Sequence, residues 1–284
     1  MNVFQRLSRG WHLGITSLEV IRDHPKLLLF PVMSGGALII AMLSFAGGIF
    51  ALFGINPQAM ESFFAALEDA NTGNVLGYLA LFAFYLITYF VVIFFNVGLV
   101  YNAQKVFEGG EPSIREGMQH AANRVVNIFA WAALAATVGV ILKSLEERLG
   151  LLGRIAISLV GFAWSIGTYF VVPVLAHENV TPVEAVKRSV SIIRERWGEA
   201  LGAGFSFGLF QMIGIVLAIV GAVIVAQFNV IAGLAVGFLT FLLSMVVTSA
   251  ARNVFLAAAY QHTQGNTPNE FDGQTLDGIF MPKR

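Results

Sequence analysis

The run ALGAGFSFGLFQMIGIVLAIVGAVIVAQFNVIAGLAVGFLTFLLSMVVTSAA, residues 200–251, contains 52 consecutive residues without a charged side chain. One continuous helix of this length would measure about 78 Å, whereas the hydrocarbon core of a bilayer is roughly 30 Å thick. The run must therefore fold back on itself, and its polar break is AQFNV, residues 226–230. It predicts two membrane-spanning helices.

The composition extends this interpretation to the whole chain. Hydrophobic residues make up 57% of it and charged residues 12%, which is about half the charge of an ordinary soluble domain. The 17 basic and 17 acidic residues balance, so no nucleic-acid partner is indicated. The absence of cysteine excludes disulfides, iron–sulfur clusters and thiol nucleophiles.

Other long uncharged runs complete a set of six predicted spans. Open strands in a bilayer would leave backbone groups without hydrogen bonds, so the predicted fold class is an all-α integral membrane protein. Residues 1–260 are expected to form a single helical transmembrane domain, and 261–284 a polar cytoplasmic tail. The predicted spans are residues 27–54, 75–104, 125–142, 155–176, 200–226 and 230–252.

The basic residues predict the orientation. Fourteen of the 17 lysines and arginines lie before the first span, in the second and fourth loops, or at the end of the chain. The other three, Lys143, Arg148 and Arg154, lie in the third loop. Because basic loops stay on the cytoplasmic side, we expect an inner (cytoplasmic) membrane protein with both termini in the cytoplasm.

Three segments outside the spans have a different pattern. In residues 3–24, 112–124 and 182–198, apolar residues recur at steps of three and four, which predicts one apolar stripe on an otherwise charged helix. The third segment begins with a capping box formed by Thr181 and Glu184. We expect these segments to be amphipathic helices at the membrane interface.

A repeated motif suggests how these parts are organised. The pentapeptide TYFVV occurs at Thr88 and again at Thr168, and a polar turn and a proline follow each copy. The order of span, turn, proline and polar helix recurs with it. The sequence therefore predicts three repeats, each an interfacial helix followed by a transmembrane hairpin.

The third interfacial segment carries a dense charge cluster. Each basic residue near an anionic leaflet would add about 1 kcal/mol of attraction, and neighbouring glutamates would cancel much of it. We predict that this helix contacts lipid headgroups or a partner protein. The predicted contact residues are Lys187, Arg188, Arg194, Arg196 and Trp197.

His177 and Glu178, just before this segment, are candidates for a metal site or an acid–base pair. A metal needs three or more ligands, and paired histidines on a helix usually have four-residue spacing. Neither pattern is present, so we interpret the pair as part of a cytoplasmic turn. No phosphate-binding loop or dinucleotide fingerprint is present, and neither a metal nor a cofactor is predicted.

GFSFG, residues 204–208, matches the nucleophile motif of serine hydrolases. That chemistry needs a strand, a sharp turn and a helix, whereas this match lies inside an apolar helix. The five histidines all lie in polar loops or interfacial segments, so no base is expected at the depth of Ser206. We instead predict small faces where helices approach closely, at Gly204, Gly208, Gly233 and Gly237.

Polar residues near the cytoplasmic ends of two spans form another candidate site. Asn96 and Asn253 occupy similar positions in their repeats, and Arg252 is expected to extend toward the interface. The functional interpretation is a polar vestibule formed by these three residues. The structural alternative is hydrogen bonding between helices.

Three stretches resemble an uncharacterised prokaryotic family of multi-pass integral membrane proteins. They are AWAALAATVGVILKSLEERLGLLGR, YFVVPVLAHENVTPVEAVKRSVSIIRERWGE and LDGIFMPKR. The layout is also similar to the membrane domain of some glycerophosphodiester phosphodiesterases, although their catalytic domain is missing. The first resemblance implies no assigned activity, so no residue roles follow from it.

The first functional hypothesis is non-catalytic, because no charged residue or histidine lies in the middle of a predicted span. The chain would be a membrane-embedded interaction or assembly subunit that contacts lipids, a second copy of itself or another membrane protein. The alternative is an oligomeric pore or carrier for a small or lipidic solute, lined by Ser244, Thr248, Asn96 or Gln211. An intramembrane hydrolase using Ser206 is the least supported hypothesis.

Overall fold

The computed structural model describes residues 3–53, 58, 61, 73–195 and 200–271. This part of the chain contains helices and no strand, which confirms the all-α fold class. Six helical segments are long and apolar enough to cross a membrane, counting η1 with α2 and α7 with α8. The helices are α1 (Val3–Asp23), the 3-10 helix η1 (Pro25–Leu28), α2 (Leu29–Phe53), α4 (Gly73–Phe107), α5 (Ile114–Asn123), α6 (Val125–Arg148), α7 (Leu151–Gly167), α8 (Val171–His177), α9 (Pro182–Glu195), α10 (Ala200–Ala226) and α11 (Val230–Thr263).

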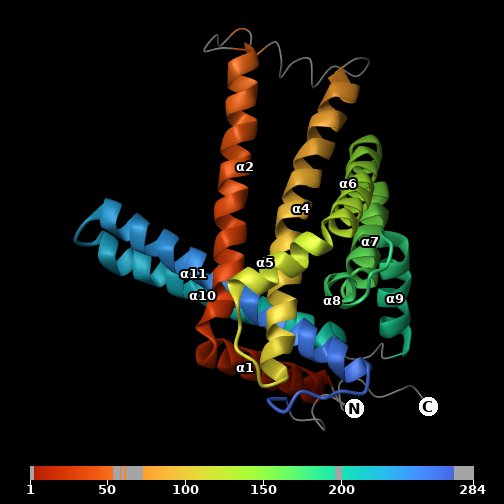
Figure 1. Ribbon diagram of the computed structural model, residues 1–284. Coiled ribbons are helices and arrows are strands. Elements are labelled where there is room, and N and C mark those ends of the chain that lie inside the picture. The colour runs from red at the N-terminus through yellow and green to blue at the C-terminus, as the bar shows by residue number, and fades with distance from the viewer. Residues whose placement is uncertain (1–2, 54–57, 59–60, 62–72, 196–199, 272–284) are drawn as a thin grey trace.

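The helices follow the expected order. Each of α1, α5 and α9 precedes a pair of long apolar segments: α2 and α4, then α6 and the α7–α8 segment, then α10 and α11. Figure 1 shows α2, α4, α6 and α7 extending toward one side of the molecule, whereas the α10–α11 hairpin crosses them at a large angle. The long helices therefore form two diverging groups.

Helix α6 continues beyond its predicted end at residue 142, as far as Arg148. The additional turns are charged, and Lys143 lies 3.8 Å from the carboxylate of Glu146 and 3.6 Å from that of Glu147. The Tyr78 hydroxyl of α4 donates to Glu147 at 3.1 Å. Ion pairs at this spacing add a few tenths of a kcal/mol each to a helix, so the charges extend the helix.

The fourth predicted span, 155–176, is divided into α7 and α8 by a turn. Pro173 accounts for the break, because it has no N–H to donate to the Tyr169 carbonyl and its ring would clash with that carbonyl in a regular helix. The backbone N–H of Phe170 donates instead to the hydroxyl of Ser189 at 3.0 Å. Ser189 is fully buried on α9, so α9 satisfies a backbone group that the break leaves free.

The best-packed region lies where α1, η1, α8 and the C-terminal halves of α4 and α11 meet. Helix α11 contributes small side chains here, including Ala250 and Ala257, which are 0% exposed. The large rings of Phe30, Phe170 and Phe255, each at most 1% exposed, fill the space between the helices. We call this region the packed end.

Helices α4 and α5 approach closely at two glycines. A methyl group on Gly117 would lie 2.8 Å from the carbonyl oxygen of Gly98 and 2.6 Å from Cζ of Phe30. Only a residue without a side chain allows the two backbones this close contact. Neither glycine was among the packing positions predicted from the sequence.

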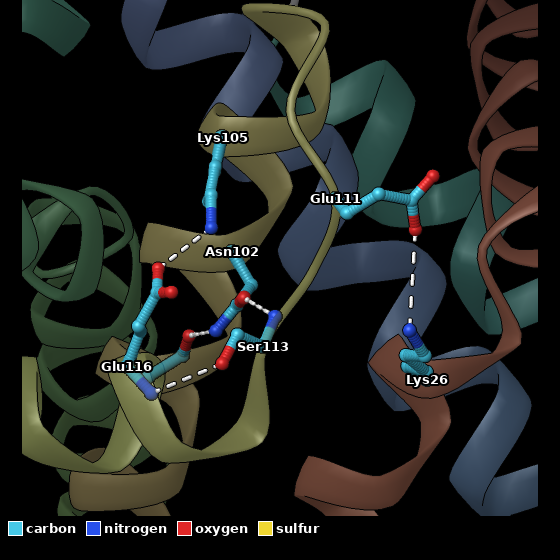
Figure 2. A network of polar contacts seen from close by, with 7 residues as sticks. Lys26, Asn102, Lys105, Glu111, Ser113 and Glu116 are labelled. Carbon is cyan, nitrogen blue, oxygen red and sulfur yellow. Dashed lines mark hydrogen bonds and ion pairs between the residues drawn. The ribbon is translucent and has the colours of Figure 1, made fainter.

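A polar network fixes the segment between α4 and α5 (Figure 2). Asn102 accepts a hydrogen bond from the backbone N–H of Ser113 at 2.6 Å and donates to the Gly98 carbonyl at 3.0 Å. Beside it, the Lys105 ammonium lies 2.7 Å from Glu116. Asn102 is fully buried, so these bonds satisfy a side chain that would otherwise be costly to bury.

Candidate functional site

A partly open cavity of about 880 Å³ lies between the two diverging groups of long helices. Its lining comes from α4 and α6 through α8 on one side and from α10 and α11 on the other. The turn between α7 and α8 contributes Thr168 and Tyr169, which places polar groups at the wall. The cavity is therefore a product of the helix crossing and of the break.

All three residues of the predicted vestibule line this cavity. The amide nitrogen of Asn253 lies 3.3 Å from the side-chain oxygen of Asn96 and 2.9 Å from the carbonyl of Ser249. Asn96 and Asn253 thus bond to each other across α4 and α11 and also border the cavity. The asparagines therefore do both things considered from the sequence: they form a hydrogen bond between helices, and they contribute to a polar vestibule.

Arg252 is the only charged side chain among the described residues that line the cavity. Its guanidinium carbon lies 5.5 Å from the centre of the Tyr169 ring, within the range of a cation–π contact. The side chain is exposed, and no carboxylate lies within ion-pair distance of it in the described part of the chain. This cation is therefore held by an aromatic ring and open to a ligand.

The residues expected to line a solute pathway lie at the same place. Gln211 of α10 and Thr248 of α11 line the cavity. Ser244 lies behind Gln211 and accepts a hydrogen bond from its amide at 3.3 Å. Ser206, the candidate nucleophile, lies on α10, but its side chain is outside the described part of the structure.

Aromatic rings form much of the remaining wall. Trp131 of α6 and Trp164 of α7 are stacked with their ring centroids 6.0 Å apart, and Phe207 and Phe241 line the hairpin side. Sequence reasoning did not identify these residues. The sequence does not show which surface an aromatic residue of an apolar helix contacts, because lipid, the protein core and a cavity all accommodate aromatic rings.

The four predicted packing glycines separate into different environments. A methyl group on Gly237 would lie 2.7 Å from the Ala222 Cβ, and one on Gly233 would lie 2.6 Å from the Ala226 Cβ. These two glycines therefore lie where α10 and α11 are in closest contact. Gly208 instead lines the cavity, and a methyl group placed on it would meet nothing within 4 Å. Of Gly204 only the helical backbone is described.

Helix α9 presents the predicted charge cluster on one face. Lys187, Arg188 and Arg194 are exposed, whereas Arg196 and Trp197 lie outside the described residues. The capping box is present: Glu184 accepts from the Thr181 backbone N–H at 2.9 Å. This hydrogen bond lowers the pKa of the Glu184 carboxyl, which favours its charged form at the start of the helix.

His177 and Glu178 belong to a hydrogen-bonded network near the packed end. Nδ1 of His177 lies 3.0 Å from the Gln104 side-chain nitrogen. Glu178 accepts from the Tyr260 hydroxyl at 2.5 Å, and Arg188 lies 3.3 Å from the same oxygen. Among the described residues no group of three or more His, Cys, Asp or Glu could hold a metal ion. The pair therefore ties α8 to α9, α4 and α11.

Comparison with known proteins adds a family to this description. No curated protein matches the chain. A family model described as a family of unknown function, DUF6159, matches residues 75–269. That range includes every residue that lines the cavity. The chain therefore belongs to the DUF6159 family of unknown function.

Proposed function

We propose that this chain is a non-catalytic, multi-pass membrane protein that holds a lipidic molecule in the cavity between its two groups of helices. The first hypothesis from the sequence was a non-catalytic protein that contacts lipid, and the alternative was a pore or carrier for a small or lipidic solute. The proposal combines the lipid contact of the first with the lipidic ligand of the second. Its binding site lies within one chain, so an oligomer is not needed to form it.

The observation that carries the proposal is the cavity itself. Small-molecule sites usually measure about 300–1,000 Å³ and combine an apolar lining with a few polar groups. The cavity, at about 880 Å³, falls within this range and has aromatic walls with polar groups from Asn96, Gln211, Thr248 and Arg252. An amphiphilic molecule from the bilayer matches this mixture of surfaces.

The proposal includes no reaction step. The cavity-lining side chains supply one cation and no carboxylate or imidazole in the described part of the chain. A general acid or base must lie within hydrogen-bond reach of the proton that it transfers. Binding and transfer of an intact molecule therefore fit the lining better than catalysis does.

We place the protein in the cytoplasmic membrane with both termini on the cytoplasmic side. The distribution of the 17 basic residues supports this orientation. Helix α1 also contacts α11, so the first and last helices of the described chain lie beside each other. On this placement the exposed cations of α9 face anionic headgroups, as expected for an amphipathic interfacial helix.

Assembly is the second candidate role. The α10–α11 hairpin projects beyond the other helices (Figure 1), and its tip exposes Phe228 and Ile231 at 89% and 80%. A second copy or another membrane protein would cover this surface as readily as lipid. The chain has no cysteine, so a single Phe228→Cys substitution followed by oxidation in membranes would trap a symmetric dimer.

The resemblance to the membrane domain of glycerophosphodiester phosphodiesterases remains a likeness of layout. No enzymatic activity is proposed from it.

Native mass spectrometry of the purified protein tests the proposed function. Gly208 has open space in front of it, so Gly208→Phe would fill the cavity without a clash against another backbone. Gly36, exposed on α2 with equally open surroundings, provides a matched control in Gly36→Phe. We expect wild type and Gly36→Phe to retain a copurified lipid and Gly208→Phe to lose it. Equal retention by all three proteins would refute the proposed site.

A further inference from the structure

We infer that the ligand of the cavity is an amphiphile with one anionic head group, which pairs with Arg252. This inference rests on the proposed function and adds the charge and orientation of the bound molecule. It follows from the placement of one cation and neutral hydrogen-bond donors in a cavity that also has large aromatic and aliphatic surfaces.

The first observation is that Arg252 has no counter-charge. It is the one charged side chain among the described lining residues, and no described carboxylate forms an ion pair with it. A cation beside apolar surface is stabilised by an anion or by water. The Tyr169 ring, 5.5 Å from the guanidinium carbon, restrains the guanidinium group. A guanidinium has five N–H donors, so a contact with one tyrosine leaves others that can bind an acid group at two points.

The second observation is that neutral donors lie near this cation. Asn96 uses its side-chain oxygen to accept from Asn253, and its own amide N–H groups have no acceptor among the described residues. Ser249, one turn before Asn253 on α11, also lines the cavity. Donors without acceptors favour an oxygen-rich head group such as phosphate or carboxylate.

The third observation is that the lining away from Arg252 is mainly apolar, although Gln211 also lies there and donates to Ser244. Phe241 lies 11 residues before Arg252 on α11, a distance of about 16 Å along the helix axis. Phe241, Met245 and the stacked pair Trp131 and Trp164 line the apolar part. A molecule with its acid group at Arg252 would lay an alkyl chain against these rings.

Zwitterionic and cationic head groups fit less well. The phosphate of a zwitterionic phospholipid can pair with Arg252, but its choline or ammonium group would then lie near the same cation, with no described carboxylate in the lining to balance it. A neutral glyceride would use the asparagines and leave the cation without a partner. The lining chemistry therefore selects a net anionic amphiphile, whether a phospholipid or a fatty acid.

Tryptophan quenching tests the inference directly. The chain has four tryptophans, and replacing Trp11 and Trp197 with Phe would leave Trp131 and Trp164, both on the cavity wall. The protein is placed in phosphatidylcholine nanodiscs that contain an equal small fraction of brominated phosphatidylglycerol, brominated phosphatidylcholine or, at pH 8, dibromostearate. Bromine quenches tryptophan on contact, so the signal reports which acyl chains enter the cavity.

We expect an anionic probe to reach half-maximal quenching at an at least fivefold lower mole fraction than brominated phosphatidylcholine, as expected for a hydrogen-bonded ion pair. Arg252→Gln should remove this preference, and Arg252→Lys should restore part of it. Arg115→Gln changes an exposed arginine on α5 outside the cavity and should preserve it. Preference for phosphatidylglycerol over dibromostearate, or the reverse, would identify the acid group.

Equal quenching by anionic and zwitterionic probes, unchanged by Arg252→Gln, would overturn the inference. Quenching of the Gly208→Phe variant then shows whether only the charge preference is wrong or whether the cavity binds no lipid at all. If Gly208→Phe lowers quenching by all probes, a lipid binds without charge selection. If Gly208→Phe has no effect on any probe, the cavity does not bind lipid and both proposals are wrong.

Discussion

The packed end and the diverging halves of the long helices both contain many apolar residues but differ in what those side chains contact. At the packed end, Leu99 of α4 is 0% exposed, and α11 contributes a series of buried alanines. In the diverging halves, Leu43 of α2 is 67% exposed and Leu239 of α11 is 63% exposed. Where helices meet, alanines and large side chains are buried together, whereas in the diverging halves large aliphatic side chains face outward.

This difference follows from the solvent. Lipid chains are as apolar as leucine, so burial of a large side chain against protein gains little over burial against lipid. Close packing of small side chains and backbones gives dispersion contacts that lipid does not match. We therefore expect substitutions at the packed end to be costly, and similar substitutions in the diverging halves to be mild.

A large effect is expected at the crossing of α4 and α5. Gly117→Leu would force a side chain against the Gly98 carbonyl and Phe30, and overpacking of this kind costs about 1–3 kcal/mol or more. The matched control is Gly36→Leu on α2, where a methyl group meets nothing within 4 Å. Unfolding by sodium dodecyl sulfate in mixed micelles would measure both. Comparable destabilisation of the two variants would remove the distinction between the regions.

Removing side-chain volume, instead of adding it, provides a second comparison of the two regions. The same Leu→Ala substitution is made once in each region. Leu99→Ala should destabilise the protein by about 2–5 kcal/mol, because it leaves a cavity in a packed site. Leu43→Ala should cost less than about 1 kcal/mol, since lipid fills the space. The same micelle assay applies, and a large loss at Leu43 would mean that α2 is covered by protein and not by lipid.

A smaller effect is expected at the α7–α8 break. Ser189→Ala would leave the Phe170 N–H without its acceptor and cost about 1–3 kcal/mol, as for other buried unsatisfied groups. Ser165→Ala serves as the control, because the exposed Ser165 only donates to the Gly161 carbonyl of its own helix. Hydrogen exchange at the break should accelerate in Ser189→Ala alone. An unchanged exchange rate would show that Ser189 does not hold α8.

The smallest effect is a dependence of stability on pH at His120. Burial is the main cause that lowers the pKa of this imidazole from 6.5, and the Arg124 guanidinium lowers it further. A histidine with a lowered folded-state pKa is disfavoured in its charged form. Stability is therefore complete above pH 6.5 and declines as pH falls from there to the folded-state pKa.

His120→Asn should flatten this part of the pH profile, measured as the unfolding midpoint in micelles between pH 8 and pH 5. The groups that face His120 are the Ala176 carbonyl at 2.7 Å, the Arg124 Nε at 3.1 Å and the stacked Tyr101 ring at 4.2 Å between centroids. His12→Asn, at an exposed position, is the control. An identical slope in wild type and His120→Asn would assign the pH dependence to other groups.

Much of the architecture could be predicted because its signals are local. Uncharged length indicates a span, and strongly polar side chains at the end of such a span are unusual enough to mark a candidate site. For this reason Asn96, Asn253 and Arg252 could be grouped before their contacts were known. Thr181 and Glu184 marked the start of α9 through a motif that depends on neighbouring residues only.

The remaining features depend on how helices rotate and cross. Gly208 and Gly237 look alike in sequence, yet one faces a cavity and the other faces α10. The stacking of Trp131 on Trp164 likewise requires two helices in one orientation. The break before Pro173 did have a local signal in the proline itself, whereas its stabilisation by Ser189 depends on contact with a distant helix.

The central claim is that the crossing of the two helix groups leaves a cavity for a lipidic molecule. A cryo-electron microscopy structure in lipid nanodiscs, with a bound antibody fragment to enlarge the particle, tests it most directly. The account predicts elongated non-protein density between α4, α7 and the α10–α11 hairpin, with its head at Arg252. A hairpin packed against α4 and α6 with no space and no density between them would contradict it.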